Sequence, residues 1–487
     1  MSRSQDRRLP WHSRASLGAA IVALAACGSD RGVPENIAGG YNGGGVIGLT
    51  GGCYLNSNPN VPNDGASVIA IDPKTRFQTM QGFGASVRLF DDPRVTNTMD
   101  PVTKRGTGGV PPENQQPILG TLYTDLGLTR VRFLPGEGGG IEPVNDNADP
   151  LVTDASKFGY AWNRGDGQLD LLSRVFGLGA RSFFVAAPTP EGWMTESSPA
   201  EYTEWLLAGL RHWKDRGYEP PYVSLKNEPG SAASGGVWSA AFLRDVTKLL
   251  GARIKAEGLK TKIVLPDDVD AREAYARLQL ILADADARQY VGAVAYHHRD
   301  PGGEAEVKQL AGQYDIPVWV TAYSAGGLMD ASTTIHSLIA DAGASAIDYA
   351  WAFSGDHEST QLVRLVASNG VYERFVRTPQ YYATGQYARY VLPGAIRVAA
   401  TSTDPNVKAV AFVQDFKLVV VVTHIGGPYE RPIRLELGPG GPCVKQVTSV
   451  RSTDVDNWSI LEPASIAIPR ITATVPAHSI TTFVGRE

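Results

Sequence analysis

A carboxylate follows a short apolar run in the stretch YVSLKNEPG, residues 222–230. The run is rich enough in apolar and β-branched residues to predict a buried strand, and Pro229, which has no backbone donor, helps to end it. Glu228 is therefore expected at the mouth of that strand, beside the side-chain amide of Asn227. A carboxyl group in this place could act as a general acid or base, although a glutamate that only caps the following helix would look the same.

The elements around this carboxylate alternate between strand and helix. Eight short runs predict strands: QTMQGFGA, TRVRFLP, SFFVAAP, YVSLKNEP, KIVLPDD, AVAYHHR, PVWVTAY and DYAWAFS. The clearest helical pattern is residues 201–216, where one face carries Tyr202, Trp205, Leu206, Gly209, Leu210 and Trp213. Eight strands that alternate with helices over residues 67–392 predict an α/β fold, a (β/α)8 TIM barrel. A doubly wound sheet is the alternative, but no GxGxxG motif follows the first strand.

The carboxyl ends of the strands in a TIM barrel meet at one mouth, so the residues that end the predicted strands should share a pocket. They include the candidate substrate-binding residues Arg132, Trp193, Asn227, Tyr296, His297, Tyr323 and Trp351. Aromatic rings beside hydrogen-bonding side chains suit a carbohydrate. His297 and His298 could bind a metal, but neighbouring strand residues point to opposite faces, so one is expected in the core and the other in the pocket. No metal-binding or phosphate-binding motif occurs, and no metal or cofactor is expected.

Beyond residue 392 the helical pattern disappears. Residues 393–487 alternate apolar and polar positions between Gly, Pro and Asp breaks, which predicts a small antiparallel β-sandwich. The stretch ASVIAIDPKTRFQTM has the same alternation, so the first strands of the 67–392 region could join the sandwich. The 487 residues, 43% hydrophobic and 20% charged, suffice for two domains. A net charge of −5 without a basic stripe argues against nucleic acid as a partner, and a monomer is expected.

Residues 1–27 predict an export signal. Four arginines precede a short apolar run, residues 17–26, that is too brief to span a bilayer. The run ends in LAAC, residues 24–27, which resembles the lipobox of bacterial lipoproteins and implies an acylated Cys27 as the only membrane contact; an ordinary signal of a secreted protein is the alternative. Residues 28–66 are rich in Gly, Asn and Pro and predict a tether. In an oxidising compartment Cys53 and Cys443 could form a disulfide, and the sequence leaves this open.

Several motifs in register resemble glycoside hydrolase family 30, of clan A, over residues 67–485. They are QTMQGFGAS, LGLTRVRF, APTPEGWM, YVSLKNEPG, AVAYHHRD, PVWVTAYS, YYATGQYARYVLPGA and the closing SITTFV. The resemblance implies a barrel with a side β-sandwich and a retaining hydrolase of β-linked substrates, from xylan and β-1,6-glucan or β-1,6-galactan to glucosylceramide. It also implies that Glu228 is the acid/base and that Asn227 hydrogen-bonds the sugar 2-hydroxyl. For a uronic acid, an Arg after the eighth strand would be needed, and Arg364 and Arg374 are candidates.

The chain departs from the family at one position. The family's seventh strand carries Trp-x-Thr-Glu-Tyr with Glu as the nucleophile, whereas residues 319–323 read WVTAY, so Ala322 occupies the nucleophile position. Retaining hydrolysis needs a second carboxylate about 5 Å from the acid, so the chain is expected to bind a β-linked oligo- or polysaccharide and hardly to cleave it. Three interpretations are open: a glycosidase whose nucleophile was deliberately replaced, a natural pseudoenzyme that binds carbohydrate, and an enzyme that uses another acid. Candidates for that acid are Glu191, Asp300, Asp356 and Glu358.

Overall fold

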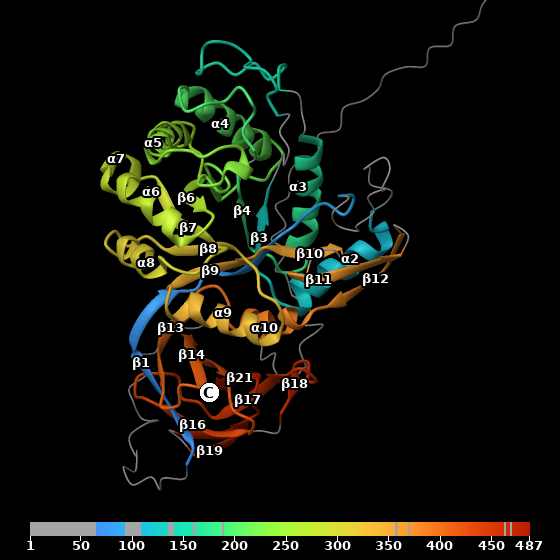
Figure 1. The fold of residues 1–487 in the computed structure, drawn as a ribbon, viewed down its shortest axis with the longest axis vertical. Helices are drawn as coiled ribbons and strands as arrows, with labels where there is room; N and C mark the ends of the chain where they lie inside the picture. The colour runs from blue at the N-terminus through green and yellow to red at the C-terminus, as the bar shows by residue number, and fades with distance from the viewer. Residues whose placement is uncertain are drawn as a thin grey trace, which may run out of the picture. The chain divides into compact units, whose positions relative to one another are not determined.

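The computed structural model describes residues 65–92, 109–134, 141–158, 162–187, 189–355, 359–368, 371–461, 464–467 and 470–487. Within these ranges eight parallel strands close into a barrel, which confirms the predicted TIM barrel (Figure 1). In order around the barrel they are β2 (Gly82–Ser86), β3 (Arg130–Phe133), β4 (Ser182–Val185), β5 (Tyr222–Ser224), β6 (Lys262–Asp268), β7 (Val291–His298), β8 (Val318–Tyr323) and β9 (Ala344–Tyr349). Each of the eight predicted runs overlaps one of these strands.

Helices follow the barrel strands in the alternation that a TIM barrel requires. They are α2 (Pro112–Gly120) with the π-helical turn η2 (Thr121–Asp125), α3 (Trp162–Phe176), α4 (Pro199–Asp215), the 3-10 turn η3 (Ala232–Ser234), α5 (Ala240–Ala256), α6 (Ala271–Ala283), α7 (Ala285–Arg288), α8 (Glu304–Gly312), α9 (Leu328–Ala340) and α10 (Pro379–Ala388). The helical pattern of residues 201–216 corresponds to α4.

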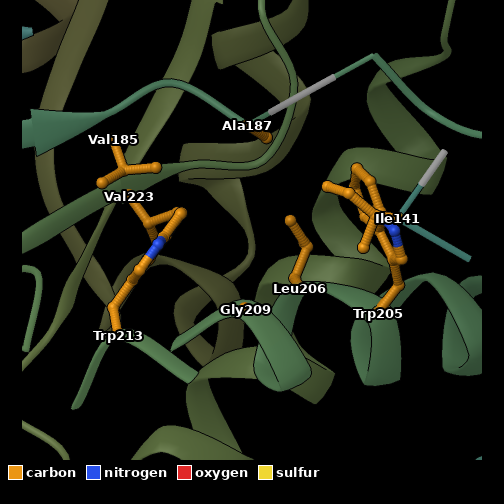
Figure 2. Close-up of a pocket in the computed structure, with 8 residues that line it drawn as sticks. All are labelled: Ile141, Val185, Ala187, Trp205, Leu206, Gly209, Trp213 and Val223. Carbon is orange, nitrogen blue, oxygen red and sulfur yellow. The ribbon is translucent and has the colours of Figure 1, made fainter. Parts of the chain in front are cut away.

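Helix α4 shows how the predicted apolar stripe is used. All six stripe residues are buried, and four of them line a gap with Val185 of β4 and Val223 of β5: Trp205, Leu206, Gly209 and Trp213. An apolar gap of about 20 Å³ lies between helix and strands, smaller than one side chain. Figure 2 shows Leu206 and Trp213 of the helix around this gap, together with Val185 and Val223 of the strands. The contact between α4 and the barrel wall is therefore closely packed apart from this gap.

The strands beyond the barrel form a ten-stranded sheet in the order β18-β17-β21-β15-β14-β13-β1-β16-β20-β19. Their bounds are β1 (Ser67–Thr79), β13 (Ile396–Ser402), β14 (Val407–Gln414), β15 (Lys417–His424), β16 (Arg431–Leu437), β17 (Gln446–Ser452), β18 (Ser459–Ile460), β19 (Ser465–Ala467), β20 (Arg470–Val475) and β21 (Ser479–Arg486). Neighbours are antiparallel except β1 and β16, which are parallel. The segment before the barrel thus contributes its first strand to this sheet.

The two faces of the sheet bury different cores. On β15, Val420 and Val422 belong to a cluster formed by the sheet's own strands, whereas Val419 and Val421 belong to the cluster of the barrel and its helices. Period-two alternation produces this division. The hydroxyls of Thr423 on β15 and Ser332 on α9 are 2.6 Å apart, within hydrogen-bond distance. The sheet therefore supports the helix that follows β8.

A three-stranded sheet lies between the barrel and α10 in the chain, and the sequence interpretation missed it. Its strands are β10 (Trp351–Gly355), β11 (Gln361–Ser368) and β12 (Val371–Arg377). β10 and β11 are parallel, and β11 and β12 are antiparallel. The eighth predicted run, DYAWAFS, is accordingly divided: its first part ends β9, and its second part leaves the barrel as β10.

Several expectations for the N-terminal part lie outside the described residues: the export signal, Cys27, most of the tether and Cys53. Cys443 is described and is disulfide-bonded. Its pairing with Cys53 stays a prediction. Among the helices of the described ranges, we find none with the length and apolar character to cross a membrane.

The packing of α4 yields a stability prediction. Leu206→Ala should lower the free energy of unfolding by about 2 to 5 kcal/mol, because it removes buried methyl groups and enlarges an existing gap. Urea unfolding followed by circular dichroism measures this change. Lys214→Ala, at an exposed position of the same helix, is the control and should change stability by less than about 0.5 kcal/mol. Equal effects of the two substitutions would contradict the packing described here.

Candidate active site

A cavity of about 420 Å³ opens where the barrel strands end, and Glu228 and Ala322 both line it. The other lining residues are Arg132, Leu134, Asn227, Ser234, His297, His298, Arg299, Tyr323, Ser324, Ala350, Trp351 and Thr360. They come from β3, from the segment after β5, from β7, β8 and β10, and from the loops that follow. The pocket is large enough for a sugar unit and combines polar groups with aromatic rings.

Backbone strain aims Glu228 into this cavity. β5 ends at Ser224, and Glu228 lies four residues later with φ 52°, in the left-handed region. Asp267 on β6 has φ 62°, and its carbonyl oxygen accepts the backbone N–H of Glu228 at 2.9 Å. Left-handed backbone is unfavourable for residues other than glycine and is concentrated at functional sites. The two strained residues therefore hold each other in place.

Three donors surround the Glu228 carboxylate. Its Oε1 accepts from Arg299 Nη2 and is paired with His297 Nδ1, each at 2.9 Å, and its Oε2 accepts from Ser234 Oγ at 2.7 Å. Burial alone would raise the pKa of Glu228, but the hydrogen bond and charge of His297, with help from Ser234 and Arg299, lower it to about 2. Glu228 is therefore ionised at neutral pH in this chain.

A second carboxylate, Asp267, lies fully buried beneath the cavity. Thr321 Oγ1 and Ser224 Oγ donate to it at 2.5 and 2.9 Å. Arg132 Nη2 and His297 Nε2 lie 3.5 and 3.4 Å from its oxygens. Burial alone would raise the pKa of Asp267, but the charge of Arg132 and the hydrogen bond from His297 hold it below its usual range. Asp267 thus supplies the buried negative charge that holds Arg132 and His297.

His297 connects the two carboxylates. Burial alone would lower the pKa of its imidazole, but the hydrogen bonds to Asp267 and Glu228 outweigh burial and raise it. Arg132 Nη2 also donates to the side-chain oxygen of Asn227 at 2.6 Å. With its oxygen used in this way, the Asn227 amide keeps its NH₂ group to donate to a ligand hydroxyl.

A β-bulge orients Ala322. In the pairing of β7 with β8, Tyr296 is opposite Val320 and His297 is opposite Ala322, so Thr321 is the extra residue on β8. The Thr321 side chain turns to Asp267, and Ala322 lines the cavity beside His297. Bulges re-aim side chains and are frequent next to active sites.

Trp351 is the aromatic face of the cavity. The Arg88 guanidinium lies 3.3 Å from the centre of its indole ring, and Arg88 is not among the cavity-lining residues. This cation–π contact fixes the ring from the side away from the cavity. Tyr323 also lines the cavity but is 98% buried, against Tyr349. Trp351 is thus the better platform for a sugar ring.

The structure does not bring every predicted residue to the cavity. Tyr296 is fully buried in the cluster formed by the barrel and its helices, because strand residues alternate between faces and Tyr296 points away from the side taken by His297. Both His297 and His298 line the cavity, instead of one of them. The indole N–H of Trp193 donates to the carbonyl oxygen of Glu142 at 2.7 Å, and Trp193 does not line the cavity. Arg364 and Arg374 are exposed on β11 and β12 and do not line it either.

The described alternative acids, Glu191 and Asp300, do not line the cavity either. Glu191 does not line the cavity, and its carboxylate accepts the backbone N–H groups of Ile141 and Glu142 at 2.6 and 3.1 Å. Asp300 is exposed and also lies outside the lining. Asp356 and Glu358 lie outside the described residues. Among the described alternatives, no carboxylate takes the place beside Ala322.

Some functional contacts were missed by sequence reasoning. Arg299 and Ser234 hold Glu228; Arg299 lies on a loop and Ser234 ends the short 3-10 turn η3, and neither segment has a periodic pattern. Arg88 is recognised only through its contact with Trp351. Lys226, fully buried, donates to the carbonyl oxygen of Ser234 at 2.5 Å; burial lowers its pKa to about 8. The sequence signal that could have pointed to Lys226 is its position directly before Asn227. In the described part of the chain, no group of three or more His, Cys, Asp and Glu residues could hold a metal ion.

Comparison with known proteins relates this chain to proteins of known fold. No protein-family model matches the chain. The Caenorhabditis elegans protein named "Putative glucosylceramidase 2" is 22% identical over 421 residues, which cover 74% of this chain and 76% of that protein. The catalytic domain of xylanase C of glycoside hydrolase family 30 from Talaromyces cellulolyticus is 20% identical with a TM-score of 0.71, and it covers 86% of this chain and 100% of its own. A family 30 endoxylanase from Clostridium papyrosolvens C71 is 21% identical with a TM-score of 0.68, and the match covers 86% of this chain and 100% of the endoxylanase.

The chain has the fold of glycoside hydrolase family 30. Glu228, at the predicted acid/base position, follows β5, which is the fourth strand of the barrel. Ala322, at the predicted nucleophile position, lies on β8, which is the seventh strand. They share one cavity, and His297 contacts Glu228 and pairs in register with Ala322.

The lowered pKa of Glu228 predicts a pH-dependent contribution to stability. A carboxylate whose pKa falls from 4.5 to about 2 on folding stabilises the protein above pH 4.5, and the stabilisation is lost as the pH falls towards 2. Glu228→Gln should therefore be less stable than the parent at pH 7, and the difference should shrink between pH 4.5 and 3. Urea unfolding at several pH values measures it. Glu306→Gln, an exposed position on α8, is the control, and a difference for Glu228→Gln that grows on acidification would contradict the assignment.

Proposed function

We propose that this chain is an exported protein of the family 30 glycosidase type that binds a β-linked oligo- or polysaccharide in the cavity and, because Ala322 occupies the nucleophile position, hardly cleaves it. The observation that carries the proposal is that Glu228, Ala322 and Trp351 line one cavity. The export signal, the lipobox at Cys27 and the tether support a role at the cell envelope or outside the cell.

The charge state of Glu228 supports the loss of turnover. A general acid has to carry a proton when the substrate binds, and the donors around Glu228 keep it ionised. A carboxylate at position 322 would place a second negative charge beside it, and like charges raise the pKa of a neighbouring carboxyl group. The missing nucleophile thus impairs two parts of the first step of retaining hydrolysis: the attack on the anomeric carbon and the protonation of the leaving oxygen.

Sugar binding does not depend on the nucleophile. Asn227 retains its amide donors, and Trp351 is held by Arg88 in a fixed orientation. A ring and donors that are already ordered lose little entropy when a ligand binds. The second candidate is therefore a natural pseudoenzyme that captures carbohydrate at the cell surface. A carboxylate restored at position 322 should give hydrolytic activity to an impaired glycosidase but not to such a pseudoenzyme.

Ala322→Glu tests the glycosidase assignment. It should raise the hydrolysis of an activated aryl β-glycoside by at least about 1000-fold with retained stereochemistry, since it restores a nucleophile opposite Glu228. A panel of aryl β-glycosides measures the rates, and NMR of the first-formed sugar gives the stereochemistry. Ala322→Gln, which has the same size but no charge, should stay inactive. A folded Ala322→Glu protein that cleaves no member of the panel would favour the binding protein.

The role of Trp351 predicts a selective loss of binding. Trp351→Ala should weaken the binding of a β-linked oligosaccharide about 3- to 10-fold, since it removes a ring face worth about 0.5 to 1.5 kcal/mol. Trp193→Ala is the matched control and should leave the affinity unchanged, because Trp193 does not line the cavity. A glycan array selects the ligand, and titration calorimetry gives the affinities. Equal losses in both variants would remove Trp351 from the binding site.

A further inference from the structure

Lys226 is a buried lysine that stands directly before Asn227 and Glu228 in the chain. Its side chain is fully buried, and it is not among the cavity-lining residues. Its Nζ donates to the backbone carbonyl oxygen of Ser234 at 2.5 Å and lies 5.5 Å from the centre of the Trp238 ring. Burial of an ammonium group is unfavourable unless a specific partner compensates it. The contact with Ser234 is therefore the feature of Lys226 that needs an explanation.

Charged groups from two neighbouring elements and from its own segment face Lys226. Asp268 on β6 and Glu228 are the acidic groups, and Arg277 on α6 is the basic one. Arg277 Nη1 pairs with Asp268 at 2.9 Å and with Glu273 at 2.7 Å. Among the described residues, the hydrogen bond of Lys226 goes to a backbone carbonyl oxygen and to none of these carboxylates. Lys226 thus restrains the backbone rather than pairing with an acid.

The segment that carries Ser234 forms a closed loop. The backbone N–H of Trp238 donates to the carbonyl oxygen of Pro229 at 2.8 Å, and the turn η3 lies between them in the chain. Gly235 follows Ser234 with φ 86°, in the left-handed region, which glycine adopts at a high cost in conformational entropy. The hydrogen bond from Lys226 holds the residue directly before this glycine, so it fixes the loop where the chain has the most conformational freedom to lose.

Ser234 passes this restraint to Glu228. Its carbonyl oxygen accepts from Lys226, and its hydroxyl donates to Glu228 Oε2 at 2.7 Å. A hydrogen bond donated to a carboxylate favours the ionised form. Protonation of Glu228 therefore becomes easier when the serine hydroxyl leaves Oε2.

We propose that Lys226 is a positioning residue of the candidate active site: by binding the Ser234 carbonyl oxygen, it keeps the Ser234 hydroxyl on Glu228 Oε2, where this hydroxyl competes with a proton. Lys226 acts through Ser234, because it does not line the cavity itself. The proposal deepens the function proposed above and rests on it for one point, the role of Glu228 as the acid/base. The contacts on which it depends are present in the unmodified chain.

The titration of Glu228 in Lys226→Met tests the proposal. Methionine has about the length of lysine and no donor, so it fills the same space and frees the Ser234 carbonyl oxygen. The glutamate carboxyl groups are labelled with ¹³C and followed by NMR from neutral pH into the acid range, and Glu228→Gln identifies the Glu228 signal.

In the unmodified chain the Glu228 signal should keep its ionised position until the pH approaches about 2, the pKa that the surrounding donors give this carboxyl group. In Lys226→Met and in Ser234→Ala the midpoint should lie at least about one pH unit higher, as expected for the loss of a hydrogen bond to a charged group.

Further variants separate positioning from charge. Lys226→Met added to Ser234→Ala should raise the midpoint by less than about 0.3 pH units, because the effect of Lys226 passes through the serine hydroxyl. Lys214→Met removes a lysine from an exposed position of α4 and should leave the midpoint unchanged. If circular dichroism shows that Lys226→Met does not fold, Lys226→Gln, which removes the charge and shortens the side chain by one bond, takes its place with the same expected rise.

The outcomes distinguish this proposal from the one on which it rests. A midpoint in Lys226→Met that equals that of the unmodified chain overturns the positioning role, whatever the activity of Ala322→Glu. Equal rises with and without the Ser234 hydroxyl would mean that Lys226 acts through its charge alone, and they overturn it as well. A folded Ala322→Glu protein without activity overturns the glycosidase function, and a raised midpoint in Lys226→Met then still supports the positioning of Glu228.

An active Ala322→Glu protein adds a catalytic measurement. Lys226→Met in this background should move the basic limb of the kcat/KM pH profile towards higher pH, because a general acid with a raised pKa keeps its proton longer. A basic limb that does not move would overturn the role of Lys226 in the reaction.

Discussion

The buried carboxylate of Asp267 is the interaction on which the rest of the site depends. It is fully buried and is reached by Arg132, His297, Ser224 and Thr321, from four different strands of the barrel. A buried charge is tolerated only where partners surround it, so the four strands must keep their relative positions. Through His297 this constraint extends to Glu228, and through Arg132 it extends to Asn227.

The same cluster maintains the shape of the cavity. Arg132 and His297 are compensated from below by Asp267, so their geometry does not require a carboxylate at position 322. The contacts of Glu228 do not depend on position 322 either, because His297, Arg299 and Ser234 hold its carboxylate. The cavity therefore keeps its shape with an alanine at position 322.

Sequence reasoning anticipated the barrel because buried strands and the α4 stripe produce periodic apolar patterns that burial requires. It missed the hairpin of β11 and β12, although Asn369-Gly370 between the two runs is a common hairpin signal. It placed both Tyr296 and His297 in the pocket, although strand alternation puts neighbouring residues on opposite faces and Tyr296 packs with the helices. It could not foresee the bulge on β8, where the extra residue Thr321 turns to Asp267 and Ala322 lines the cavity. Arg299 lies on a loop and Ser234 in the three-residue turn η3, and segments of this kind carry no periodic sequence pattern.

The bulge also decides how position 322 relates to its neighbours. Thr321 is turned towards Asp267 by a 2.5 Å hydrogen bond, and the following residue must then point into the cavity whatever its side chain is. The orientation of position 322 is thus set by Thr321 and Asp267, and Ala322 contributes nothing to it beyond its backbone. A small side chain there leaves the frame intact, and Ala322 shares a single cavity with Glu228, Asn227 and Trp351.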